Sequence, residues 1–258
     1  MIPKIIHYTW FSGEEMPEKL KACLESWKMH LPDYEFVMWD AEALSGIDNV
    51  FMKEALSCRK WAYAADFVRL YALYHSGGIY LDTDVMLYRD FDDLLANDAF
   101  IGKENSVHFE DGMTECYLSS HCFGACAGHP FIKKCLDYFS DRHFILSNDE
   151  TLPATLRYNM VLLPYVQSEI AKGMGHDASA TKKHEGEQLP GLTVYPSCFF
   201  DPQYTTADSY CRHLAIGGWR EYEQYNPRPT LAYKIQWRWA DFLHRLLGKD
   251  KYAVIKLH

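Results

Sequence analysis

The chain has 258 residues, of which 48% are hydrophobic and 24% are charged, and this balance is typical of a folded globular protein rather than a disordered one. A chain of this length can form one large domain with a sizeable core. Its net charge of −9 argues against a nucleic-acid partner, because proteins that bind nucleic acids usually present a basic face.

The cysteines and the N-terminal residues bear on the cellular compartment. None of the eight cysteines forms a Cys-x-x-Cys pair, so a structural zinc site has little support. The first residues lack the basic and long apolar regions of a signal peptide. No stretch approaches the roughly 18 apolar residues of a membrane-spanning helix. We therefore expect reduced thiols in a cytoplasmic protein.

The first predicted elements form a β-α-β unit. Ile2 to Tyr8 is short, apolar and β-branched, as expected of a buried strand. Pro17 suits a first helical turn and opens a predicted helix through His30. Tyr34 to Trp39 is predicted as the second strand. This order favours an α/β fold, with a parallel sheet covered by helices.

The following elements lead to an acidic motif. Asn49 to Leu56 is predicted to be helical, and Trp61 to His75 is a stronger helix for which Gly77 is a plausible C-cap. Ile79 to Leu81 is a short apolar strand that leads into Asp82-Thr83-Asp84.

The remaining elements complete a single domain over residues 1–258. Strands are predicted at Ala99–Lys103, His121–Ala127, Leu192–Pro196 and Ser209–Leu214, and helices at Pro130–Phe139, Ala154–Leu163 and Thr230–Leu247. Residues 104–119 are expected to be irregular, and 172–188, rich in Gly, Lys and His, to form a flexible insertion. The helix at 230–247 is basic and amphipathic, which suits either peripheral contact with an anionic membrane or packing on the domain.

The acidic motif places two carboxylates one residue apart. In an extended backbone, Asp82 and Asp84 point to the same side, where their charges repel each other unless a cation lies between them. Oxygen ligands suit hard divalent ions such as Mg²⁺ or Mn²⁺. The alternative is a turn with two solvated acids.

The helix before this motif carries a charged pair. Asp66 and Arg69 are three residues apart and share a helix face. A surface salt bridge is one reading, but the flanking residues are nearly all apolar, which favours the wall of a cleft. There, Asp66 can accept hydrogen bonds from hydroxyls and Arg69 can bind phosphate or sugar oxygens.

These segments resemble the signature of glycosyltransferase family 32, which shares the DXD sugar-binding motif. The matching residues are Ala65 to Arg69 and Gly77 to Asp84, supported by Ile2 to Trp10 and by Gly128 to Phe131. The resemblance implies a GT-A fold, which is a nucleotide-sugar-binding α/β domain. It also implies a nucleotide-sugar donor, a divalent ion (usually Mn²⁺, otherwise Mg²⁺) and retention of the anomeric configuration.

The resemblance further implies roles for individual residues. Asp84 is expected to bind the metal, and Asp82 to contact ribose, the donor sugar or the metal through water. Asp66 and Arg69 are expected to hold the donor sugar, and Trp10 to stack on the nucleotide base. The expected catalytic set is Asp66, Arg69, Asp82 and Asp84.

Two later segments resemble family segments less closely. His213 precedes Trp219 by six residues and is expected to bind the metal or the diphosphate, although a structural histidine is the alternative. Trp219 could cover the diphosphate or belong to the core, and Gly218 replaces the usual Ser. Either Asp149 or Glu150 is expected near the anomeric carbon of the donor sugar, and the alternative for each is a polar loop at the start of a helix.

The predicted function is metal-dependent, retaining transfer of a hexose in surface polysaccharide synthesis. The expected donor is a UDP-sugar, and the expected acceptor is a glycan or a lipid-linked saccharide. The protein is expected in the cytoplasm or at the inner face of the membrane. One alternative is a haloacid dehalogenase-like phosphatase, which would need a later acidic segment that the chain lacks after Val85. Another is a non-catalytic sugar- or nucleotide-binding relative.

Overall fold

The computed structural model describes residues 1–110 and 113–216. In this part of the chain the helices are α1 (Glu18–His30), α2 (Val50–Ser57), α3 (Trp61–Ser76), α4 (Pro130–Asp137), α5 (Ala154–Arg157), α6 (Leu163–Lys172) and α7 (Ser197–Phe200). The main sheet contains β1 (Ile5–Thr9), β2 (Glu35–Trp39), β3 (Gly78–Leu81), β5 (Ala99–Lys103), β8 (Leu118–Ala125), β9 (Glu187–Leu189) and β10 (Leu192–Tyr195). Two further pairs are β4 (Val85–Leu87) with β11 (Cys211–His213), and β6 (His108–Glu110) with β7 (Met113–Glu115).

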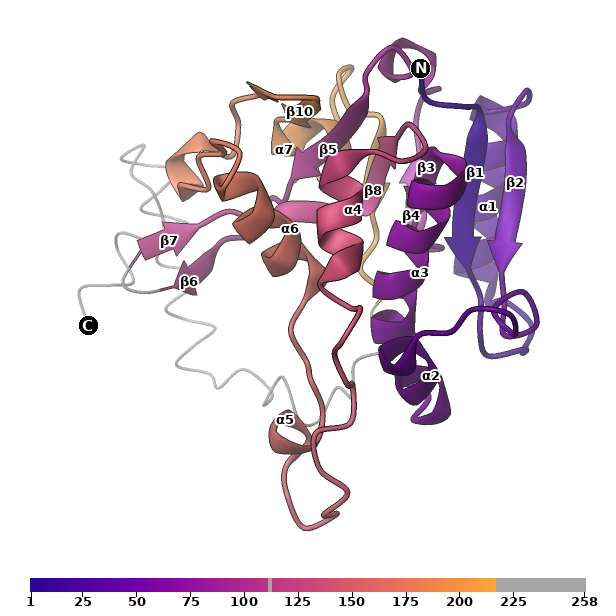
Figure 1. The fold of residues 1–258 in the computed structure, drawn as a ribbon. Helices are drawn as coiled ribbons and strands as arrows, with labels where there is room; N and C mark the ends of the chain where they lie inside the picture. The colour runs from indigo at the N-terminus through magenta and orange to yellow at the C-terminus, as the bar shows by residue number, and fades with distance from the viewer. Residues whose placement is uncertain (111–112, 217–258) are drawn as a thin grey trace, which may run out of the picture. The chain divides into compact units, whose positions relative to one another are not determined.

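The seven-stranded sheet has the order β2-β1-β3-β8-β5-β10-β9 (Figure 1). The pairings show that β2, β1, β3, β5 and β10 run in one direction, whereas β8 and β9 run against them. The sheet is therefore mixed and mostly parallel. This confirms the predicted α/β class with a mixed, mostly parallel sheet.

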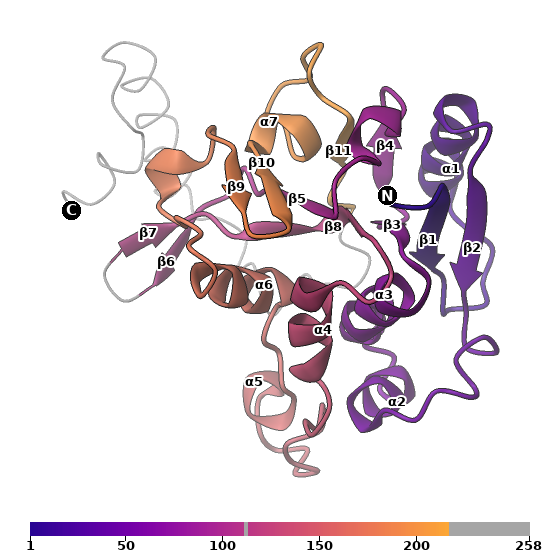
Figure 2. The same cartoon turned by 45° about the horizontal axis from the view of Figure 1, so that its top comes forward.

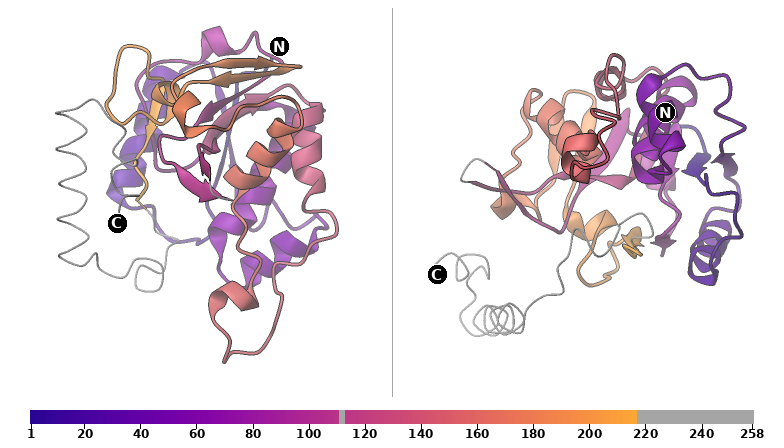
Figure 3. Two further views of the ribbon diagram at one scale, coloured as in Figure 1. Left: turned by 90° about the vertical axis from the view of Figure 1, so that its left-hand side faces the viewer. Right: turned by 90° about the horizontal axis from the view of Figure 1, so that it is seen from below.

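Helices cover both faces of this sheet. Figure 2 shows α3, α4 and α6 on one face and α1 and α7 on the other, and the view from below in Figure 3 agrees. Alternate residues of β3 explain the two layers: Tyr80 packs into the core beneath α3, whereas Ile79 and Leu81 pack into the core on the opposite face. Burial of both faces accounts for the continuous apolar run in this strand.

Two glycines allow β3 to enter the sheet between β1 and β8. Gly77 ends α3 with a φ of +67°, and Gly78 has a φ of +112°. A Cβ atom on Gly78 would lie 2.7 Å from the carbonyl oxygen of Ile5, and one on Gly77 would lie 2.8 Å from the amide of Ala127. The positive φ angles and the close backbone approach both require glycine here.

Two predictions about elements were wrong. A single helix was expected over 154–163, but α5 ends at Arg157 and α6 begins at Leu163. The chain leaves the helix at Tyr158, whose backbone is extended, and Pro164 lies in the first turn of α6, a position that suits proline. Residues 104–119, expected to be irregular, contain β6, β7 and the first residues of β8.

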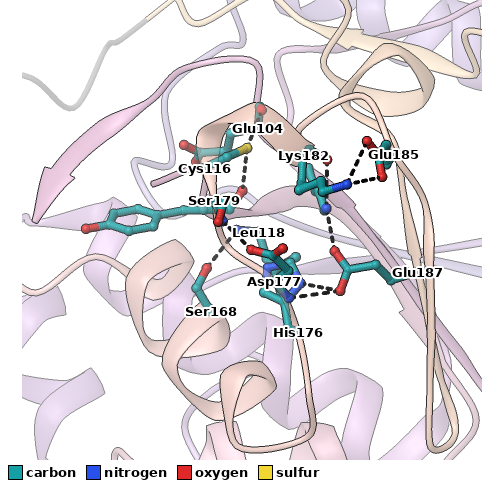
Figure 4. Close-up of polar contacts among 12 residues, drawn as sticks. Glu104, Cys116, Leu118, Ser168, His176, Asp177, Ser179, Lys182, Glu185 and Glu187 are labelled. Carbon is teal, nitrogen blue, oxygen red and sulfur yellow. Dashed lines mark hydrogen bonds and ion pairs between the residues drawn. The ribbon is translucent and has the colours of Figure 1, made fainter. Parts of the chain in front are cut away.

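The segment 172–188 is attached to the sheet by buried polar contacts (Figure 4). Lys103, at the end of β5, is fully buried; its ammonium pairs with Glu187 and donates a 2.9 Å hydrogen bond to the carbonyl of Lys182. Glu187 also accepts hydrogen bonds of 3.0 Å from His176 Nδ1 and from the amide of Asp177. These contacts attach Lys182 and Glu187 to β5. The predicted flexibility of the segment stays a prediction.

No helix among the described residues combines the length and the apolar character that crossing a membrane requires. The predicted helix at 230–247 and Trp219 lie outside the described residues.

Candidate active site

Two carboxylates and an imidazole meet at the end of β3. Asp82 and Asp84 come from the β3–β4 connection, and His213 comes from β11, which pairs with β4. One possible ligand atom of each lies within 4.8 Å of those of the other two. The two acids were expected on extended backbone, but they lie in a turn. The amide of Val85 donates a 3.0 Å hydrogen bond to the carbonyl of Asp82 and closes this turn.

Asp84 is held from two directions. Its Oδ1 lies 3.0 Å from His213 Nε2, and its Oδ2 accepts a 3.0 Å hydrogen bond from the amide of Ile216. Burial disfavours charge on both Asp84 and His213, yet their mutual contact keeps the pKa of Asp84 below its ordinary value and that of His213 above it. Without another cation, the imidazolium form of His213 neutralises Asp84.

Arg69 lies between Asp66 of α3 and Asp82 of the DXD motif. Its Nη2 is 3.3 Å from Asp66 Oδ1 and 3.2 Å from Asp82 Oδ1. Its Nη1 donates a 2.6 Å hydrogen bond to the carbonyl of Ser120. The pair predicted at a cleft wall is therefore buried, and its guanidinium contacts the first acid of the DXD motif.

Tyr80 belongs to this network, although the sequence analysis did not single it out. Its hydroxyl donates a 2.9 Å hydrogen bond to Asp82 Oδ1 and lies 3.3 Å from Thr9 Oγ1. Its ring lies beneath the guanidinium of Arg69, with 4.5 Å from Cζ to the ring centroid. Alternation along β3 was an available signal, because Tyr80 and Asp82 are two residues apart.

Asp66 is the most deeply buried acid of the site. Burial raises its pKa to about 7, and Asp82 adds to the shift, while Arg69 and a hydrogen bond from the amide of Leu163 oppose it. Leu163 begins α6, so Asp66 links α3 to α6. Near neutral pH, Asp66 can therefore either donate or accept a hydrogen bond.

The other predicted site residues are less closely tied to this cluster. Trp10 directly follows β1, and its indole Nε1 donates to the carbonyl of Glu14 at 2.8 Å. Asp149 is exposed and accepts hydrogen bonds from Thr151 in the loop before α5. Figure 1 shows α5 projecting on the side toward which β1 and β2 point. In the part of the chain that the structure describes, the hydrogen bonds of Asp149 are local, and none reaches Asp82 or Asp84.

The donor set fits a divalent cation. Asp82 and Asp84 supply carboxylate oxygens, and His213 supplies a nitrogen once it is deprotonated. The hydrogen bonds to Asp84 and Asp82 fix carboxylate orientations, as the outer partners of metal ligands do.

Replacement of Asp66 by Asn should change how stability depends on pH. Because the pKa of Asp66 is raised in the folded state, the folded protein binds more protons than the unfolded chain between about pH 4 and 7, and stability falls as pH rises through this range. The Asp66→Asn variant has no carboxyl group at this position, so this fall in stability with rising pH is absent. The free energy of unfolding of the variant relative to the wild type should therefore be higher at pH 8 than at pH 5, by about 1–3 kcal/mol. Urea unfolding in EDTA at both pH values measures this, and an equal difference at the two would contradict it.

Comparison with known proteins finds a family match over the region that contains the acids. The model of the family described as "Glycosyltransferase sugar-binding region containing DXD motif" matches residues 17–101, which include Asp66, Arg69, Asp82 and Asp84. Inositol phosphoceramide mannosyltransferase 3 of Schizosaccharomyces pombe is 35% identical over 139 residues, covering 51% of this chain and 35% of the relative. The chain thus spans about a third of the length of the yeast relatives.

Two further proteins extend the comparison. The uncharacterized glycosyltransferase L373 of Acanthamoeba polyphaga mimivirus is 29% identical over 228 residues, covering 85% of this chain and 84% of the relative. The solved structure of the PaToxG glycosyltransferase is 20% identical, with a TM-score of 0.46 over 67% of this chain and 69% of that one. The family match and the assembled DXD acids agree: residues 17–101 of this chain are similar to the glycosyltransferase sugar-binding region that contains the DXD motif.

Proposed function

We propose that the protein transfers a hexose from a nucleotide sugar to a glycan or lipid-linked acceptor, with retention of configuration and with Mn²⁺ or Mg²⁺ bound at Asp84, Asp82 and His213. The observation that carries this proposal is the convergence of these three residues beside the Asp66–Arg69 pair. The imidazole favours a transition ion such as Mn²⁺ over Mg²⁺. The bound ion would neutralise the charge that develops on the leaving diphosphate.

Arg69 and Asp66 have separate roles in this proposal. Arg69 is held by the carbonyl of Ser120 and by Asp82, so its position is fixed before a donor arrives. A fixed guanidinium stabilises charge without reorganisation during the reaction. Asp66 can hydrogen-bond to sugar hydroxyls in either protonation state, because its pKa lies near 7. Burial of the pair excludes water that would compete for the same hydroxyls.

Trp10, Asp149 and Trp219 belong to the proposal as donor-binding residues. A base-stacking role for Trp10 is supported by its place directly after Thr9, whose hydroxyl lies 3.3 Å from that of Tyr80. The acceptor stays open between a glycan and a lipid. The name of the fission-yeast relative includes an inositol phosphoceramide acceptor, which supports the lipid class. A role in surface polysaccharide synthesis at the inner face of the membrane is part of the same proposal.

A donor panel tests this function. The purified full chain is incubated with MnCl₂ and with UDP-glucose, UDP-galactose or a mannose donor, which is included because the yeast relatives are named for mannosyl transfer. A true donor at about 100 times its dissociation constant should raise the free energy of unfolding by about 2.7 kcal/mol and should release its nucleotide. EDTA should abolish both effects. Absence of stabilisation and of nucleotide release with every donor would contradict the proposal.

A further inference from the structure

Three consecutive residues of β8, Ser119, Ser120 and His121, lie beside the site and contact its residues or each other. None of them was predicted to have a role. The carbonyl of Ser120 accepts the hydrogen bond from Arg69, and the carbonyl of His121 accepts a 2.9 Å hydrogen bond from the amide of Asp82. These are backbone contacts that any side chain at positions 120 and 121 would preserve. The imidazole of His121 makes a separate set of contacts.

The imidazole of His121 stacks on that of His213. The ring centroids are 4.6 Å apart and the ring planes differ by 18°. His121 is 5% exposed, and its ring is fixed on two sides: Ser119 Oγ lies 2.8 Å from Nδ1, and Nε2 lies 3.1 Å from the carbonyl of Phe200. Since a carbonyl only accepts, Nε2 carries a proton and donates to Phe200, and Nδ1 shares the second hydrogen bond with the Ser119 hydroxyl.

His213 needs such support because its own strand is short. β11 has three residues and pairs only with the three-residue β4 among the described residues. A two-stranded ribbon of this size is marginally stable by itself. The side chain of His213 must nevertheless present Nε2 toward Asp84, where the distance is 3.0 Å. Stacking against the ring of His121 keeps the imidazole plane of His213 nearly parallel to it and so restricts rotation of the His213 side chain.

We propose that His121 is a positioning residue: its ring, fixed by Ser119 and Phe200, holds the imidazole of His213 in the orientation that completes the cation site with Asp82 and Asp84. This inference rests on the proposed metal-dependent function. It assigns the orientation of a ligand on β11 to a side chain on β8, a strand of the main sheet. The stacking face is the part of His121 that matters, and its ring nitrogens serve to hold that face in place.

Two substitutions at position 121 separate stacking from mere burial. His121→Ala removes the ring and should weaken Mn²⁺ binding about tenfold, in the range found for outer partners of metal ligands. His121→Phe keeps a flat ring of similar size but lacks the two ring nitrogens that hold it, so it should recover part of that loss. Free Mn²⁺ is measured by its EPR signal, which does not require turnover. His129→Ala, which removes another buried histidine at the start of α4, is the matched control and should leave Mn²⁺ affinity unchanged.

Ser119→Ala tests the same proposal if His121→Ala fails to fold. It removes only the hydroxyl that fixes the His121 ring, and we expect Mn²⁺ affinity to fall about threefold, below the effect of losing the ring. Wild-type affinity in both His121→Ala and Ser119→Ala would overturn the positioning role while leaving the proposed function intact. A wild-type protein that binds no Mn²⁺, with or without donor, would instead overturn the proposed metal dependence, and this inference with it.

Discussion

Asp84→Asn should abolish Mn²⁺-dependent turnover. The carboxamide keeps the shape of the side chain but removes the negative charge that faces His213 and that would bind the ion. Metal stabilisation of a leaving group is worth several kcal/mol, so we expect a fall in kcat of about 100-fold or more. Release of nucleotide from the best donor of the panel, followed at saturating MnCl₂, measures this loss.

The control for Asp84→Asn is Asp33→Asn, which removes one exposed carboxylate at the turn between α1 and β2. It changes the net charge equally and should retain wild-type activity. Mn²⁺ binding should be lost only in Asp84→Asn. An Asp84→Asn enzyme with near-normal activity would show that Asp84 is not the principal metal ligand.

Arg69→Met should destabilise the fold as well as abolish activity. The variant leaves Asp66 and Asp82 without the cation that lies 3.3 and 3.2 Å from them. Removing one partner of a buried ion pair typically costs about 3–5 kcal/mol. Urea unfolding of the two proteins measures the loss, and we expect a comparable fall in the free energy of unfolding.

A surface pair and a double variant complete this test. Arg89→Met breaks a half-exposed pair with Asp93 and should cost less than about 1 kcal/mol. Asp66→Asn combined with Arg69→Met should recover part of the stability lost in the single variant, because one uncompensated charge disappears, but it should not recover turnover. Equal losses for Arg69→Met and Arg89→Met would show that the site contains no strongly coupled buried charge.

Local patterns predicted the elements that position the acids. The apolar run before Asp82, the helix carrying Asp66 and Arg69, and the C-cap at Gly77 all lie near each other in sequence, and the structure places them as expected. The start of α6 had a usable signal in Pro164, because proline favours the first turn of a helix. β4 is three residues long, too short for periodicity to identify.

Contacts between distant residues were harder to predict. Lys103 is buried because Glu187 lies beside it, and a charged residue at the end of a strand gives no local sign of such a partner. The start of β8 is similar: Ser119 and His121 hydrogen-bond to each other inside the strand, so the polar sequence conceals that the strand begins at Leu118 rather than at His121. His213 was found only through the family resemblance, and its pairing with Asp84 depends on the β4–β11 register.

The pairing of β4 with β11 also has a consequence for the order of assembly during synthesis. Asp84 and Ile216, joined by a hydrogen bond, are 132 residues apart in the chain. A ribosome releases the N-terminal residues first, so β1, β2 and β3 can associate long before His213 has been translated. A nascent chain that ends before β11 therefore carries the acids without their histidine, and the cation site is completed only near the end of translation of the described residues.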